Sequence, residues 1–258
     1  MEKIIRNPLL FSVIVFLLVM PITWGLLYSV LSKFPQFLGE ITKYNLTLII
    51  TIIISIIVYK KIPFTLKNNN FLKGLFTFGL LGFICAIMAF IFSYNKIDII
   101  PNVSTIIQYI IYCLIVAISE EFLFRGLIFN SMLIGFKDKI WISIILSSLI
   151  FGLRHLLNLI SMPDMVISTI GQVGFTFMAG FYLCSVYLRI KNIWICIFIH
   201  FLEDFLTGFW ALFTIQKVAD GTIISTRMLV LIHSVYIIFG ILMLKDKEYK
   251  YEPLYEIK

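Results

Sequence analysis

Residues 104–134 read STIIQYIIYCLIVAISEEFLFRGLIFNSMLI, and this stretch decides the fold class of the chain. An apolar run of about 20 residues lets an α-helix cross the hydrocarbon core of a bilayer. At about 1.5 Å per residue this run would be about 45 Å long, so the helix must tilt, bend or project from the membrane. Glu120, Glu121 and Arg125 lie inside it. A charge at the centre of a membrane helix costs roughly 2.5–3.5 kcal/mol even on insertion scales, so such charges indicate function.

The rest of the chain has the composition of an integral membrane protein. Of its 258 residues 60% are hydrophobic and 14% are charged, and the mean hydropathy is +1.01, whereas soluble domains carry about 25% charged residues. The net charge of +7 does not indicate nucleic-acid binding, because the basic residues cluster in loops between apolar runs. The four cysteines lie inside apolar runs without metal-ligand spacing, so we interpret them as small buried apolar side chains.

About eight apolar runs could form transmembrane helices, and they do not alternate in polarity as the strands of a β-barrel do. They cover residues 8–31, 44–60, 71–94, 104–134, 140–158, 165–188, 192–213 and 227–244. The prediction is an all-α fold, a polytopic membrane helix bundle that forms a single domain over residues 1–258. Its motif-bearing core covers about residues 104–213. The first run is too long for a signal peptide, so we predict an uncleaved helix that is kinked at Pro21.

The distribution of basic residues predicts that both termini are cytoplasmic. Lys and Arg are enriched in the cytoplasmic loops of membrane proteins. With the N-terminus inside, most of the 21 Lys and Arg residues fall in cytoplasmic segments. The segments assigned to the outside contain Lys33, Lys43, Lys96, Lys217 and Arg227.

Two further predicted spans carry polar side chains that a membrane helix normally excludes. Arg154 and His155 lie in the fifth span, and His200, Glu203 and Asp204 lie in the seventh. We expect Arg154 to extend its charged end to the outer surface. Glu203 is interpreted as a bystander that pairs with an arginine. His233, in the last span, is interpreted as a satisfied core histidine.

Spacing along the helices predicts which of these groups can meet. Residues four apart share a helix face, so Glu121 can pair with Arg125, and His200 lies on the same face as Asp204. Glu120 lies about 100° around the helix from Glu121, so the two acids can have different environments.

Depth along the spans predicts convergence. Counted from the assigned cytoplasmic ends, Glu120, His155 and Asp204 lie at the same depth to within about 5 Å, with His200 about one turn nearer the cytoplasm. We therefore expect one intramembrane site.

The same residues form a recognisable set of motifs. Glu120 to Arg125 fit EExxxR, Phe151 to His155 fit FxxxH, and His200 to Asp204 fit HxxxN/D. In this order, on separate membrane helices, the set resembles the CPBP family. That family groups the type II CAAX prenyl endopeptidases with bacteriocin-processing and immunity proteins, formerly called the Abi family.

The resemblance implies intramembrane proteolysis of a membrane-associated peptide. Glu120 and His155 would activate the water that attacks the peptide carbonyl, and His200 and Asp204 would stabilise the oxyanion. Glu121 and Arg125 would shape the site. General base catalysis typically contributes 10²–10⁴-fold, and preorganised donors at an oxyanion contribute a comparable factor. The implied partners are this substrate and the lipid bilayer, with no nucleic acid.

Two points of mechanism stay open at the level of sequence. CAAX-type members commonly have asparagine where this chain has Asp204, and an ionised aspartate cannot donate a hydrogen bond. Asp204 would be protonated, would orient His200 or would bind a cation. No cofactor is favoured, because there is no HExxH motif. The alternative is a Zn²⁺ ion held by Glu121, His155, His200 and Asp204.

Two rival functions have different consequences. A non-catalytic bacteriocin self-immunity or membrane scaffold protein of the same family would keep the polar set as a structural network. A transporter would use it as a proton relay, but no internal repeat supports that function. The abundance of Ile, Phe, Lys and Asn indicates an AT-rich bacterial genome, so we expect a multi-pass protein of the bacterial plasma membrane.

Overall fold

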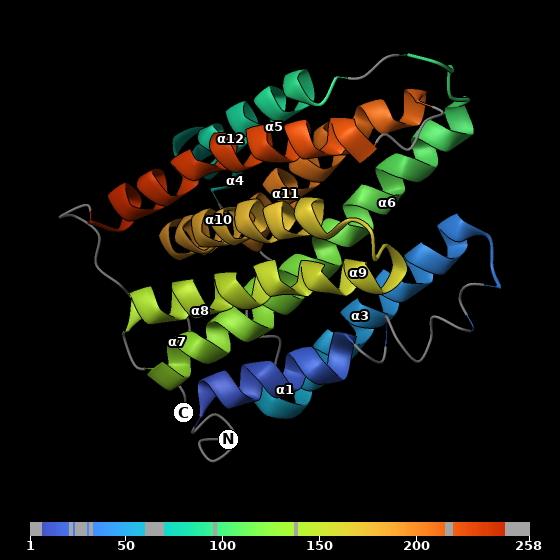
Figure 1. The fold of residues 1–258 in the computed structure, drawn as a ribbon. Coiled ribbons are helices and arrows are strands. Elements are labelled where there is room, and N and C mark those ends of the chain that lie inside the picture. The colour runs from blue at the N-terminus through green and yellow to red at the C-terminus, as the bar shows by residue number, and fades with distance from the viewer. Residues whose placement is uncertain are drawn as a thin grey trace.

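The structure is a computed structural model that describes residues 7–20, 23, 30, 33–59, 70–94, 97–136, 139–214 and 219–245, without the side chains of residues 161 and 219–226. Every regular element within these ranges is a helix (Figure 1), so the all-α prediction is confirmed.

Seven of the described helical segments are long and apolar enough to cross a membrane, which makes the chain a multi-pass membrane protein. They are α3 (Gln36–Tyr59); α4 (Phe71–Gly74), η2 (Leu75–Gly79) and α5 (Leu80–Phe92); α6 (Val103–Glu121), η3 (Phe122–Phe129) and α7 (Asn130–Phe136); α8 (Ile140–Leu153), η4 (Arg154–Leu157) and α9 (Asn158–Ser161); α10 (Val166–Ile190); α11 (Ile193–Gly208) and η5 (Phe209–Phe213); and α12 (Ala219–Lys245).

The start of the chain differs from the prediction in two places. The helix α1 (Pro8–Met20) is a shorter apolar helix, and the expected kink at Pro21 lies outside the described residues. The second span begins at Gln36 rather than near residue 44, so Lys43 belongs to a helix and not to a loop. The helix tolerates this charge because Lys43 pairs with Glu40 one turn earlier.

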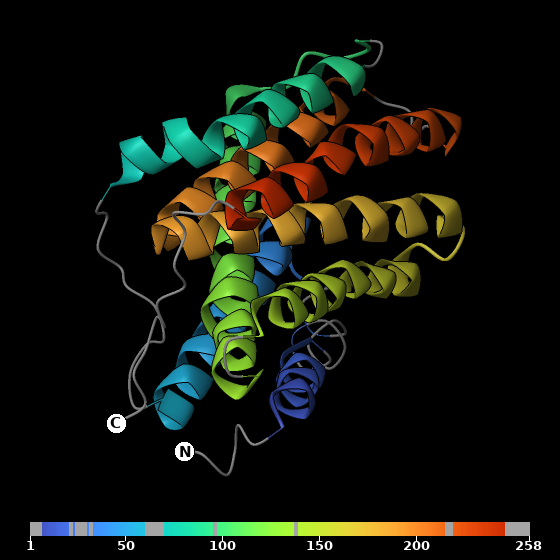
Figure 2. The same ribbon diagram turned by 90° about the vertical axis from the view of Figure 1, so that its left-hand side faces the viewer.

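The long segment that contains the paired acids is inclined to the other helices, as its length requires (Figures 1 and 2). It begins at a cap, where the Asn102 side chain accepts a hydrogen bond from the Thr105 amide at 2.8 Å. Directly after Glu121 the backbone widens into the π-helical η3. The Asn130 side-chain amide then donates to the carbonyls of Arg125 and Gly126, at 3.1 and 2.8 Å.

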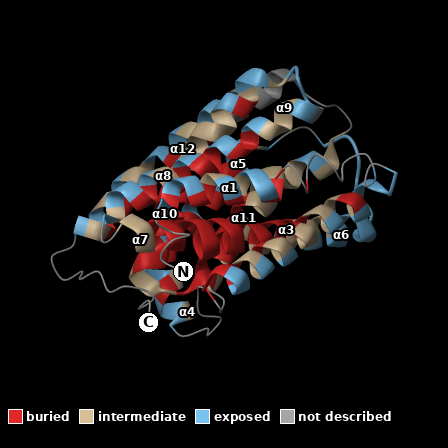
Figure 3. Cartoon of the chain, turned by 90° about the horizontal axis from the view of Figure 1, so that it is seen from below, coloured by how far each residue is buried: buried red, intermediate tan, exposed pale blue. Residues whose placement is uncertain are grey.

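The helix α10 forms the centre of the bundle. It packs against α12 and α8, while α11 packs against α5 and α6, and α3 packs against α6. Figure 3 shows the buried residues gathered in the interior, around α10 and α11. The four cysteines are buried free thiols, as predicted. Large apolar side chains such as Ile57, Leu72 and Phe76 are exposed on the outside of the bundle, where lipid chains would contact them.

Candidate active site

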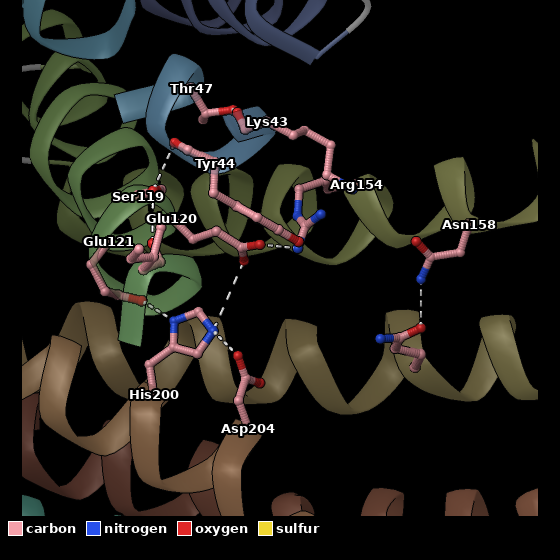
Figure 4. Close-up of polar contacts among 12 residues, drawn as sticks. Lys43, Tyr44, Thr47, Ser119, Glu120, Glu121, Arg154, Asn158, His200 and Asp204 are labelled. Carbon is pink, nitrogen blue, oxygen red and sulfur yellow. Dashed lines mark hydrogen bonds and ion pairs between the residues drawn. The ribbon is translucent and has the colours of Figure 1, made fainter. Parts of the chain in front are cut away.

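Charged and polar side chains come together where α6, η4 and α11 meet, and Figure 4 shows Glu120, Glu121, Arg154, His200 and Asp204 there. The last turn of α6 supplies Glu120 and Glu121, and α11 supplies His200 and Asp204. The turn η4 supplies His155. The helix α11 is held beside α6 by Tyr109, whose hydroxyl donates to the backbone carbonyl of Asp204 at 2.9 Å.

Glu121 and Arg125 form the ion pair that their spacing predicts. Arg125 Nη1 donates to Glu121 Oε1 at 2.7 Å, and both side chains are fully buried. The Arg125 guanidinium also lies over the Phe151 ring, 4.4 Å from its centroid, which is a cation–π contact. An ion pair that is buried and packed against an aromatic ring in this way can hold neighbouring groups in a fixed geometry.

His200 is the group that connects the acids. Its Nδ1 lies 2.7 Å from Glu121 Oε1, so this nitrogen donates to the carboxylate. Its Nε2 lies 3.9 Å from Glu120 Oε2 and 3.5 Å from Asp204 Oδ2. The His200 ring thus lies between the two acids of α6 and Asp204 of its own helix. Asp204 is the open member of the set, with 39% of its side chain exposed.

Arg154 does not extend to the surface, which corrects the expectation from sequence. It is buried, and its Nη2 donates to Glu120 Oε1. The physical reason is the tightening of the helix from α8 into the 3₁₀ turn η4. This turn directs Arg154 and His155 inward and leaves Leu153 and Leu156 exposed. The sequence alone could not give the direction in which Arg154 points.

His155 is buried, and neither ring nitrogen has a hydrogen-bond partner among the described residues. Its ring makes a T-shaped contact with the Phe151 ring, with centroids 6.0 Å apart. The His200 ring makes a T-shaped contact with the same Phe151, with centroids 5.8 Å apart. Buried polar groups are normally paired, so an unpaired buried imidazole is suited to bind water or substrate. Phe151 was present in the motif, but its role as a shared support of Arg125 and both histidines was not predicted.

Glu203 and His233 belong to a separate cluster. The Tyr236 hydroxyl donates to Glu203 Oε1, and His233 Nε2 lies 3.7 Å from the same oxygen. His233 Nδ1 donates to the Leu229 carbonyl at 2.7 Å, which fits a satisfied core histidine. Glu203 therefore lies outside the site, as expected, but its partners are a tyrosine and a histidine rather than an arginine.

The side chains considered as zinc ligands do not form a ligand set. They are Glu121, His155, His200 and Asp204. Glu121 Oε1 already accepts from Arg125 and faces His200 Nδ1, whereas Oε2 has no hydrogen-bond partner among the described residues. Within the described part of the chain, no three His, Cys, Asp or Glu side chains are grouped so that they could hold a metal ion. These four side chains therefore form no preformed zinc site in the part of the chain that the structure describes.

Residues 102–206 match a family model described as type II CAAX prenyl endopeptidase Rce1-like. The matched range begins at the N-cap of α6 and ends two residues after Asp204, so it contains the acids of α6, the turn η4 and the polar residues of α11. No curated protein matches the chain.

Proposed function

From its membership of the CPBP family, which residues 102–206 carry, we propose that the chain is an intramembrane endopeptidase. It hydrolyses a peptide bond of a membrane-associated peptide or protein, and the attacking water is activated by Glu120 and His155. The family is one of CAAX-type proteases. The roles of individual residues and the nature of the substrate are the proposal.

One observation carries the assignment of the base. Glu120 is buried, with one oxygen bound to Arg154 and the other, Oε2, facing the site. His155, which directly follows Arg154, has no partner for either ring nitrogen among the described residues. A water held by these two groups can lose a proton to them as its oxygen bonds to the carbonyl carbon. The proton then passes to the leaving amine as the C–N bond breaks, which gives a carboxylate and an amine.

His200 is suited to stabilise the oxyanion. Its Nδ1 donates to Glu121, which in turn is held by Arg125, so the direction of the ring is fixed. Donation to an oxyanion requires the imidazolium form of His200, in which both ring nitrogens carry a proton. Nε2–H is then aimed at the open part of the site, beside Asp204. A donor that is already oriented stabilises the charge of the tetrahedral intermediate without reorganisation.

Asp204 is best suited to orient His200. Of the three roles that the sequence leaves open, this one is supported by the 3.5 Å approach of Oδ2 to Nε2. The carboxylate is partly exposed, and no ligand set for a cation surrounds it among the residues that the structure describes.

The test is cleavage by the purified protein in liposomes. Two probes separate the substrate classes: a peptide that ends in a prenylated cysteine and three further residues, and an unprenylated peptide with an apolar membrane anchor. Wild type is compared with Glu120→Gln and with the matched control Glu203→Gln, the same change at a buried glutamate outside the site.

We expect wild type and Glu203→Gln to cleave a probe at the same rate and Glu120→Gln to be slower by at least about 10²-fold. A chelator should leave the wild-type rate unchanged. Cleavage by Glu120→Gln at the wild-type rate would contradict the role of Glu120. Unchanged biological function of Glu120→Gln would instead favour a non-catalytic immunity or scaffold role.

A further inference from the structure

We propose that Arg154 is a positioning residue that decides which oxygen of Glu120 acts as the base. The guanidinium holds Oε1, and Oε2 is left for the water and His200. This inference rests on the proposed function, since it assigns a task to Arg154 only if Glu120 is the base. Arg154 occupies one of the variable positions of FxxxH, so none of the three motifs specifies it.

The two oxygens of Glu120 have different partners. Oε1 accepts a hydrogen bond from Arg154 Nη2, while Oε2 lies 3.9 Å from His200 Nε2. Both side chains are almost fully buried, at 1% and 4% exposed, so bulk water does not compete with the hydrogen bond between them. A charge-assisted hydrogen bond in such surroundings fixes the rotation of the carboxylate. Without it the carboxylate could turn and present either oxygen.

Arg154 is itself fixed by a third element. Figure 4 shows the Tyr44 side chain, from α3, pointing to the Arg154 guanidinium. The Ser119 hydroxyl donates to the Tyr44 backbone carbonyl at 2.9 Å, which ties α3 to the residue before Glu120. The guanidinium therefore connects α3, α6 and η4 at one point.

The task of Arg154 differs from that of Arg125. Arg125 lies one turn from Glu121 on the same helical segment, so that pair braces the segment itself. Arg154 comes from the next segment and directly precedes His155. The hydrogen bond from Arg154 to Glu120 thus also fixes the position of His155 relative to α6. Loss of Arg154 should disturb both groups that activate the water, while His200 keeps its contact with Glu121.

The experiment measures kcat and KM in liposomes for Arg154→Lys, Arg154→Gln and Arg154→Ala, with the peptide probe that wild type cleaves. A misplaced base should lower kcat of Arg154→Ala by about 10²-fold, with KM unchanged. Arg154→Lys keeps a charged donor and should recover much of this loss, whereas Arg154→Gln should not. Guanidinium ion added to Arg154→Ala should restore activity, and the same concentration of sodium chloride or urea should not.

The inference is overturned if Arg154→Ala has the wild-type kcat, if its loss appears in KM, or if neither lysine nor guanidinium restores kcat. Should Arg154→Ala fail to fold, equal kcat of the Lys and Gln variants decides against the inference. Glu120→Gln, assayed in parallel, separates the two claims. An active Glu120→Gln overturns the proposed function, whereas an inactive Glu120→Gln beside a fully active Arg154→Ala overturns only the task of Arg154.

Discussion

At the scale of single residues, Glu121 is the side chain on which the others of the site depend. The same oxygen accepts from Arg125 and His200, both at 2.7 Å, and the carboxylate is fully buried. The carboxylate oxygen that pairs with Arg125 therefore also orients the His200 ring. A change here should affect stability and activity together.

We predict that Arg125→Met lowers the free energy of unfolding by about 3–5 kcal/mol, because removal of one partner leaves a buried charge unpaired. The double variant Glu121→Gln/Arg125→Met should be less destabilised than Arg125→Met alone. Thermal unfolding in detergent measures both. If the destabilisation of the double variant equals the sum for Glu121→Gln and Arg125→Met alone, the ion pair itself adds no stability.

Asp204→Asn should keep activity at or above the wild-type level. The asparagine amide can donate a hydrogen bond to an oxyanion, and its oxygen can still face His200 Nε2, now 3.5 Å from the aspartate. Asp204→Ala should lower kcat because nothing then orients the ring. Loss of activity in Asp204→Asn equal to that of Asp204→Ala would show that the negative charge itself is required.

The sequence predicted the members of the site better than their connections. Intramembrane charges are expensive, so their positions along the chain were informative, and spacing was enough to pair Glu121 with Arg125. The direction of Arg154 and the meeting of Glu203 with Tyr236 depend on how whole helices are rotated about their axes. A single sequence does not contain that rotation, nor the change from α to 3₁₀ geometry at η4, directly after α8.

At the scale of helices, the position of η4 depends on the close approach of α8 and α10. Gly152 lies three residues before His155, and a Cβ atom there would lie 2.8 Å from the carbonyl oxygen of Val173 in α10. Only a residue without a side chain allows this contact with backbone. The glycine therefore sets how near α8, and with it His155, lies to the centre of the bundle.

Gly152→Ala should destabilise the protein by roughly 1–3 kcal/mol through overpacking, and should lower kcat by displacing His155. Gly174→Ala is the matched control, since a Cβ there would meet its nearest neighbour, Val230 Cγ2, at 4.0 Å. It should leave stability unchanged or raise it by up to about 1 kcal/mol through helix propensity. Detergent thermal unfolding and kcat together check this, and equal effects of the two variants would contradict it.

Hydropathy predicted most of the helices, with two informative failures. The second span begins at Gln36 because Glu40 and Lys43 neutralise each other one turn apart, which a count of apolar residues treats as a loop. The excess length of the 104–134 run showed that it must tilt, but the widening into η3 directly after the paired acids was not predictable. It follows from packing and from the carbonyls that Asn130 satisfies.

At the scale of the whole molecule, the distribution of basic residues predicts the orientation in the membrane. Lys139 precedes α8 and Asp164 follows α9, and both are exposed at opposite ends of the same span. A cysteine at 164 should react with a membrane-impermeant maleimide in whole cells, and one at 139 only after permeabilisation. The four native cysteines are buried, and labelling of the protein without an added cysteine gives the background signal. The reverse pattern would contradict this orientation of the span.

In the proposed function, Glu120 activates the water that hydrolyses a peptide bond inside the membrane. The most direct measurement is mass spectrometry of a cleavable peptide probe after incubation with wild type, Glu120→Gln and Glu203→Gln in liposomes. We predict two products from wild type and Glu203→Gln whose masses sum to that of the substrate plus one water, and intact probe with Glu120→Gln. The same two products from Glu120→Gln, at the wild-type rate, would contradict the claim.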